Sequence, residues 1–192
     1  MEPTRPSSRA IMSPWRAAHL ARWVDERKTS RTYRVGHRDS HHRSVLRSFC
    51  DARPSRNLRV VAHQEITADW WTRRRMRFDL YISRLVIDEA SAGDVEAAAG
   101  RLVTLEGIPR LEFTESASIL AANLVAEAAI PREAIEDALH VAVAAAHGMD
   151  YLLTWNCRHI ANATMRNRIA DVCAASGFEA PVICTPEELL ED

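Results

Sequence analysis

Three positions in the chain carry oxygen-bearing side chains that are suited to sharing a cation. Asp88 and Glu89 follow an apolar run, Asp137 lies in the first turns of a predicted helix, and Asn156 follows a predicted strand. Acidic oxygens gathered at one place repel each other unless a cation lies among them, and carboxylate and amide oxygens suit Mg²⁺ or Mn²⁺. The chemistry this indicates is metal-assisted hydrolysis of a phosphodiester. Helix capping is an open alternative explanation for Asp137, because acids often begin helices.

The elements around Asp137 and Asn156 predict that these two residues meet. From Asp137 the chain runs about eleven residues down a helix at about 1.5 Å per residue, and it turns at Gly148. It then returns from Asp150 to Asn156 along a strand at about 3.3 Å per residue. Both residues therefore fall at the edge of a parallel sheet where the strands end and ligands bind.

The apolar patterning predicts an α/β fold in which strands alternate with helices around a short parallel sheet. Helices are expected over 58–76, 94–104, 114–127, 131–146 and 165–175, and strands over 78–86, 110–113, 151–154 and 182–184. Thr114 is the expected N-cap of its helix. Thr185 and Glu188 have the spacing of a capping box that opens a terminal helix.

The charge distribution divides the chain near residue 50. Residues 1–50 hold 11 Lys and Arg against 4 Asp and Glu, a net of +7, whereas residues 51–192 hold 14 against 22, a net of −8. The first segment has no sustained hydrophobic period, so we expect a basic, disordered or non-native head, with a nucleic-acid-binding arm as the alternative. The domain itself is expected over 51–192.

Composition excludes several classes of protein. No apolar run reaches the roughly 18 to 20 residues of a membrane span, and the head lacks the apolar stretch of a secretory signal. A cytoplasmic protein that does not contact a membrane is therefore expected. The four cysteines form no C-x-x-C pair and are expected to be reduced thiols.

Residues 137–156, DALHVAVAAAHGMDYLLTWN, resemble the C-terminal signature of the PIN-domain ribonucleases. The whole of 51–192 resembles one branch of their VapC-like toxins. Residues 89–93, EASAG, match the family's E-x-x-x-G, in which Glu89 is the second active-site acid. Asp137 matches the third acid, and Thr154 and Asn156 match the T-x-[DN] element that completes the site.

The resemblance implies a three-layer PIN-like fold and a Mg²⁺- or Mn²⁺-dependent endoribonuclease. Glu89 and Asp137 would hold the metal, while Thr154 and Asn156 would orient water or substrate. The implied partners are an RNA substrate, a cognate antitoxin and a second copy of the chain. A non-catalytic, degenerate toxin that still binds an antitoxin or dimerises is the alternative, and a PIN nuclease of RNA processing is a third possibility.

The family's first strand and first acid are not found where the resemblance places them. Residues 36–46 read GHRDSHHRSVL, which predicts no strand, so the first strand is expected to be missing or replaced. Codons read one nucleotide earlier in this stretch permit I-E-T, and we hypothesise a frameshift between Leu46 and Asp51. A coding sequence that cannot encode I-E-T would exclude it. Loss of the first acid predicts impaired catalysis.

Arg158 and His140 are the candidate RNA-binding residues. Arg158 lies two residues after Asn156, at the predicted edge. His140 lies one turn after Asp137, and its alternative role is that of a partly buried, satisfied polar group. Of the neighbours Trp70 and Trp71, one is expected in the core and the other on a partner surface.

Overall fold

A computed structural model describes residues 8–12, 58–93 and 95–190. Their centre is a five-stranded sheet in which every pair of neighbouring strands is parallel, in the order β3-β2-β1-β4-β5. The strands are β1 (Ser8–Met12), β2 (Phe78–Ser83), β3 (Arg110–Leu111), β4 (Tyr151–Leu153) and β5 (Val182–Cys184). The predicted α/β class with a short parallel sheet is thus confirmed.

The middle strand of the sheet comes from the basic head. Ile11 pairs with Tyr81 of β2 on one side and with Leu152 of β4 on the other. The expected first strand is therefore replaced, and for residues 8–12 the expectation of disorder is wrong. A run of five residues, three of them apolar, is too short to show the periodicity of a strand within a basic segment. The hypothesised frameshift and the boundary at residue 51 lie outside the described residues.

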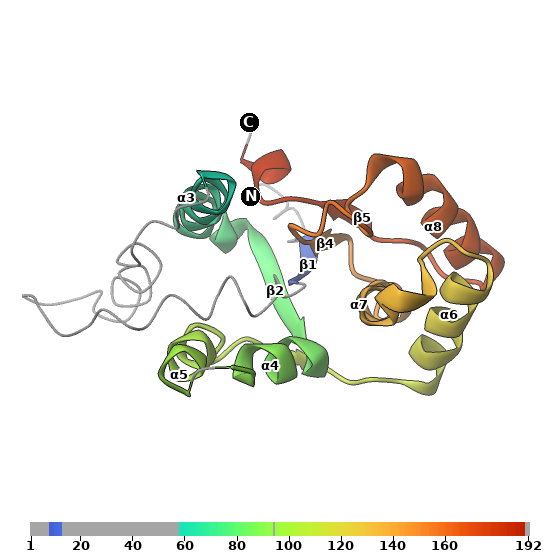
Figure 1. Ribbon diagram of the computed structural model, residues 1–192, viewed down its shortest axis with the longest axis horizontal. Helices are drawn as coiled ribbons and strands as arrows, with labels where there is room; N and C mark the ends of the chain where they lie inside the picture. Colours follow the sequence, from blue (N-terminus) through green and yellow to red (C-terminus); the bar gives the residue numbers. More distant parts are fainter. Residues whose placement is uncertain (1–7, 13–57, 94, 191–192) are drawn as a thin grey trace, which may run out of the picture.

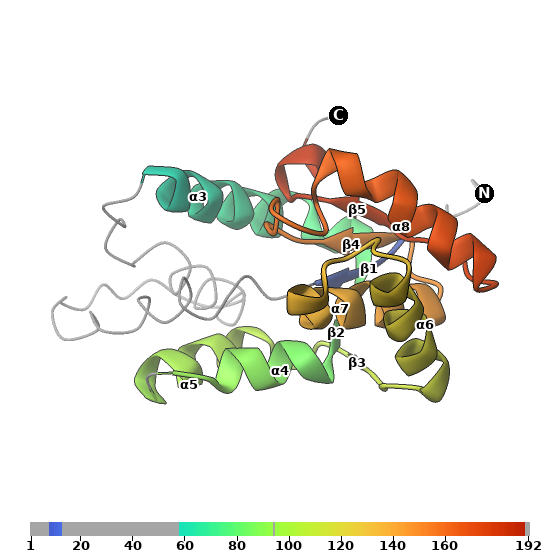
Figure 2. The same cartoon turned by 45° about the vertical axis from the view of Figure 1, so that its right-hand side comes forward.

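Helices cover both faces of the sheet and complete three layers (Figure 1). One face is covered by α6 (Glu115–Ala126), α7 (Ile135–Ala146) and α8 (Ala163–Ala175), and the other by α3 (Leu58–Arg73), α4 (Arg84–Ser91) and α5 (Val95–Thr104). The described residues also form short 3-10 helices, which are η1 (Arg75–Arg77), η2 (Arg132–Ala134) and η3 (Glu187–Leu189). Figure 2 shows the same division from a second direction.

Two separate apolar clusters fill the spaces between these layers. Ile11 belongs to the cluster beneath α6, α7 and α8, whereas its neighbour Ala10 belongs to the cluster with Trp70. Successive residues of a strand point to opposite faces, and both of these side chains are fully buried. The strand from the head thus contributes to both halves of the core.

Local signals begin and end the helices that position the site. The Thr114 hydroxyl accepts a hydrogen bond from the Ala117 N–H at 3.2 Å, so the predicted N-cap of α6 is confirmed. After α7 the chain turns at Gly148, whose φ of 59° lies in the left-handed region that glycine adopts without steric cost. The predicted turn toward β4 is therefore present.

Helix α4 differs from the predicted extended strand over 78–86. The strand ends at Ser83 and a helix follows at once, so Glu89 lies in a helix instead of a loop. The buried residues of α4, Val86 and Ala90, are four positions apart. This spacing fits one face of a helix and one face of a strand equally well, so a short apolar run does not distinguish the two.

Both tryptophans of α3 are buried, so the expectation that one of them faces a partner is wrong. The Trp70 and Trp71 rings meet edge to face at 6.4 Å, and the Arg75 guanidinium lies 4.6 Å from the Trp71 ring centroid. An arginine side chain can cover an aromatic face while its charge stays near water. Burial of adjacent residues is thus possible at this end of the helix.

Two further expectations concern the chain as a whole. None of the helices in the described residues is both long and apolar enough to cross a membrane. Cys157, Cys173 and Cys184 are free thiols, as expected, and Cys50 lies outside the described residues. Burial raises the pKa of Cys173 to about 11, and burial with the nearby Glu188 carboxylate raises that of Cys184 to about 12.

Candidate active site

The structure brings Asp137 and Asn156 together at the carboxyl edge of the sheet. Asn156 Nδ2 donates a hydrogen bond to Asp137 Oδ1 at 2.8 Å, across 19 residues of sequence. This is the meeting predicted from the lengths of the helix and of the returning strand. Asp137 lies in the first turn of α7, where a carboxylate is also favoured by the helix dipole.

Asn156 is held by further hydrogen bonds as well. Its backbone N–H donates to Thr154 Oγ1 at 3.1 Å, and its Oδ1 accepts from the His159 N–H at 3.2 Å. Its backbone carbonyl accepts from the Ala161 N–H at 2.9 Å. An amide is the group that can both donate to Asp137 and accept from a backbone N–H. The side chain is therefore oriented from both ends.

Thr154 helps to position the loop that follows β4 and carries Asn156. Its side chain is buried, and its backbone N–H donates to the Cys184 carbonyl at 2.9 Å, which continues the pairing of β4 with β5. The predicted role in orienting water or substrate has no direct counterpart in these contacts. Thr154 instead orients Asn156 through the Asn156 backbone.

Glu89 meets α7 through His140. Glu89 Oε1 and His140 Nε2 are 3.0 Å apart, and His140 is 2% exposed. The His140 ring therefore faces Glu89 instead of solvent, while its contact with RNA stays a prediction. The open alternative of a buried polar group agrees with these contacts, although the buried Nδ1 of His140 has no hydrogen-bond partner within the described part of the chain.

Helix α7 unites the two pairs. Asp137 and His140 are three residues apart in the same helix and so lie on one face of it. Glu89, bonded to His140, is thereby brought to the end of the sheet where Asp137 contacts Asn156. The neighbouring acid Asp88 is turned to Arg84 at 3.5 Å and is exposed. Glu89 is thus the acid of α4 that joins the cluster.

The loop that carries Asn156 is also anchored to α3. The Trp155 ring stacks on His63 with centroids 4.0 Å apart and an angle of 11° between the planes. Trp155 Nε1 donates to Thr67 Oγ1 at 2.8 Å. Sequence reasoning missed this anchor because 88 residues separate Thr67 from Trp155. Arg158, farther along the same loop, is exposed and available to a large ligand.

The first acid that the resemblance to PIN-domain ribonucleases predicts has no counterpart in β1. None of the residues Ser8–Met12 is acidic. Among the described residues, no group of three His, Cys, Asp or Glu side chains is arranged to hold a metal ion. At the end of β2, the neighbour of β1, the buried Ser83 hydroxyl has no hydrogen-bond partner among the described residues. The central part of the edge is therefore less complete than the part formed by α7 and β4.

The donor chemistry of the cluster nevertheless fits Mg²⁺ or Mn²⁺. Glu89 and Asp137 supply carboxylate oxygens, and Asn156 supplies an amide. Mg²⁺ is commonly held by one or two carboxylates, with water and substrate phosphates completing its shell. Glu89 and Asp137, at one edge of the sheet, provide two carboxylates of this kind.

Comparisons with protein-family models, with curated proteins and with solved structures returned no match to this chain. The fold and the hydrogen-bonded residues themselves describe a three-layer α/β domain with a polar cluster at the carboxyl edge of a parallel sheet.

Proposed function

We propose that this chain is a metal-dependent endoribonuclease of the PIN-domain toxin type, impaired as it stands by the lack of the first active-site acid. The observation that carries the proposal is the placement of two hydrogen-bonded pairs, Glu89 with His140 and Asn156 with Asp137, within one turn of α7. These residues come from α4, α7 and the loop after β4, which are far apart in sequence. A purely capping role for Asp137 would not require the other two elements.

In this proposal Glu89 and Asp137 hold Mg²⁺ or Mn²⁺. When bound there, such an ion would supply Lewis-acid chemistry, polarising a scissile phosphate and lowering the pKa of bound water. Asn156 keeps Asp137 in place, and His140 keeps Glu89 in place. The exposed Arg158 would contact the RNA backbone through its charge in this proposal.

The missing acid predicts weak or absent cleavage. Two carboxylates attract a divalent ion less strongly and offer it fewer ligand atoms than three, and β1 supplies none. Cleavage by this chain should therefore need Mn²⁺ or Mg²⁺ well above the concentrations that suffice for a complete site. Robust Mg²⁺-dependent cleavage of structured RNA, abolished by Asp137→Ala, would contradict the impairment while supporting the nuclease.

Two adjacent acids of α4 provide a matched test. Glu89→Gln should weaken Mn²⁺ binding and remove residual cleavage of a structured RNA, since Glu89 contacts His140. Asp88→Asn should change neither, because Asp88 is exposed and turned to Arg84. Equal effects of the two substitutions, or Mn²⁺ binding unchanged by Glu89→Gln, would contradict the proposed site.

The proposed partners are an antitoxin and a second copy of the chain, met in the cytoplasm. Several large apolar side chains are exposed and suited to such contacts: Phe113, Ile119, Ile135 and Val182. Protection from proteolysis by a partner but not by Mn²⁺, in a chain that cleaves no RNA, would favour the non-catalytic alternative.

A further inference from the structure

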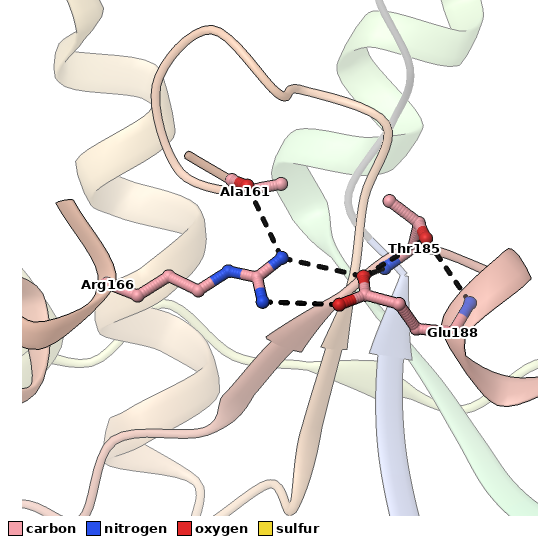
Figure 3. Close-up of polar contacts among 4 residues, drawn as sticks. All are labelled: Ala161, Arg166, Thr185 and Glu188. Carbon is pink, nitrogen blue, oxygen red and sulfur yellow. Dashed lines mark hydrogen bonds and ion pairs between the residues drawn. The ribbon is translucent and has the colours of Figure 1, made fainter. Parts of the chain in front are cut away.

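A second polar network lies directly behind the loop that carries Asn156. Arg166, in α8, forms an ion pair with Glu188 of η3, with Nη1 and Oε1 3.2 Å apart (Figure 3). The other terminal nitrogen, Nη2, approaches Glu188 Oε2 at 3.5 Å. The pair joins two elements that follow β4 and β5 in the chain.

Glu188 is itself held in place by the turn after β5. Its Oε2 accepts hydrogen bonds from the Thr185 N–H at 2.7 Å and from the Thr185 hydroxyl at 3.1 Å. The Glu188 N–H donates back to Thr185 Oγ1 at 3.4 Å, so the predicted capping box is present, although it opens a 3-10 turn. Partial burial by itself raises the pKa of Glu188, but the hydrogen bonds from Thr185 and Arg166 outweigh it and hold that pKa below its usual value.

Arg166 also reaches the loop that ends at α8. Its Nη2 donates to the Ala161 carbonyl at 3.3 Å (Figure 3). The Ala161 N–H in turn donates to the Asn156 carbonyl at 2.9 Å. Asn156 therefore receives its position from Asp137 on one side and, through Ala161 and Arg166, from Glu188 on the other.

The ion pair is poorly suited to a purely stabilising role. Both side chains are about a third to a half exposed, at 33% and 46%, and ion pairs at such exposure contribute little to the free energy of unfolding. Its geometric effect is larger, because a guanidinium fixed by a carboxylate presents its remaining donors in set directions. The carbonyl of Ala161 lies in one of those directions.

We propose that the Arg166–Glu188 pair is a positioning device that holds the Ala161 carbonyl and so keeps Asn156 directed at Asp137. Only its consequence for metal binding and cleavage rests on the proposed function. Arg166 acts through the backbone of the loop, and it is a positioning residue.

Amide hydrogen exchange in the full chain tests the device without reference to activity. Arg166→Met should speed exchange in residues 156–161 by about tenfold relative to β4, since one charge-assisted hydrogen bond to the loop is lost. Arg168→Met is the matched control, because Arg168 lies in the same helix and donates to a backbone carbonyl, that of Glu127, away from this loop. Equal acceleration throughout the chain, or the same local effect from Arg168→Met, would overturn the proposal.

Mn²⁺ titration gives the second readout. Arg166→Met should weaken Mn²⁺ binding by about tenfold, because it loosens Asn156, which orients the proposed ligand Asp137, and outer partners of metal ligands commonly contribute that much. Arg166→Lys should recover part of the affinity, because lysine keeps the charge and N–H donors but not the planar fork of the guanidinium. Arg168→Met should bind like the wild type. Unchanged Mn²⁺ binding by Arg166→Met would overturn the device. A wild-type chain that binds no Mn²⁺ would instead contradict the proposed function. Hydrogen exchange would then be the test of whether the Arg166–Glu188 pair positions the loop.

Discussion

The two halves of the sheet's carboxyl edge differ in how completely their polar groups are paired. Around β4 and α7, Asn156 is bonded through its side chain and its backbone, and the loop behind it is tied to α3 and α8. Around β1 and β2, the buried Ser83 hydroxyl has no hydrogen-bond partner among the described residues. Buried polar atoms without partners are uncommon and costly.

This difference indicates which half of the site depends on a missing group. The half near β4 satisfies its own hydrogen bonds and should keep its geometry without a ligand. The other half has the unpaired hydroxyl of Ser83 at the end of β2, beside the central strand Ser8–Met12, which carries no carboxylate. An added anionic group at this edge should therefore have a large effect on cation binding.

The largest expected effect tests the central strand itself. Ile11→Ala should lower the free energy of unfolding by about 2–5 kcal/mol, because Ile11 is fully buried against the cluster beneath α7. Val182→Ala in the exposed position of β5 is the control and should change it little. Denaturant unfolding measures both. An unchanged stability of Ile11→Ala would mean that the head does not supply the strand.

A substitution at Asn156 tests cation binding in the half of the edge near β4. Asn156→Asp would place a carboxylate against Asp137 at the 2.8 Å contact and remove its donor. Without metal it should cost about 1–3 kcal/mol, since like charges at this distance repel and a hydrogen bond is lost. With Mn²⁺ the three carboxylates should bind more tightly than the wild-type pair, so the Tm of this variant should rise more on Mn²⁺ addition.

Asn162→Asp is the control for that substitution. Asn162 is the N-cap of α8 and accepts from the Thr164 N–H at 3.0 Å, a role that aspartate fills equally well. Its Tm should therefore not depend on Mn²⁺ more than that of the wild type. A Tm of Asn156→Asp that does not respond to Mn²⁺ would argue against a cation site at this edge.

The smallest expected effect is the pH dependence of the network behind the loop. Because the pKa of Glu188 is lowered in the folded chain, its contribution to stability is present above pH about 4.5 and is lost as the pH falls through the lowered value. Glu188→Gln should therefore be less stable than the wild type near neutral pH, and the difference should shrink in acid. The adjacent exposed Glu187, changed to Gln, is the control. A difference independent of pH would contradict this assignment.

Sequence patterns were sufficient where the deciding contacts are close along the chain. The Thr114 cap, the turn at Gly148 and the Thr185–Glu188 capping box each depend on residues within one turn, and all three are present. The meeting of Asp137 with Asn156 followed from the lengths of one helix and one strand. These lengths are set by backbone geometry and require no knowledge of the rest of the fold.

Patterns failed where distant segments decide the outcome. Ser8–Met12 is a strand because β2 and β4 flank it, and those partners are about 70 and 140 residues away. His140 is buried because α4 places Glu89 against it, in a helix that the apolar run near residue 83 did not predict. The contact of Arg166 with Glu188 depends on where α8 and η3 pack.

The sequence by itself therefore determined the α/β class, most helices and the pairing of Asp137 with Asn156. Only the tertiary structure decided which segment fills the middle of the sheet, which acid of α4 joins the site and what holds the Asn156 loop from behind. The physical reason is that backbone hydrogen bonds and helix caps are local, whereas burial and side-chain pairing depend on which surfaces meet after the chain has folded.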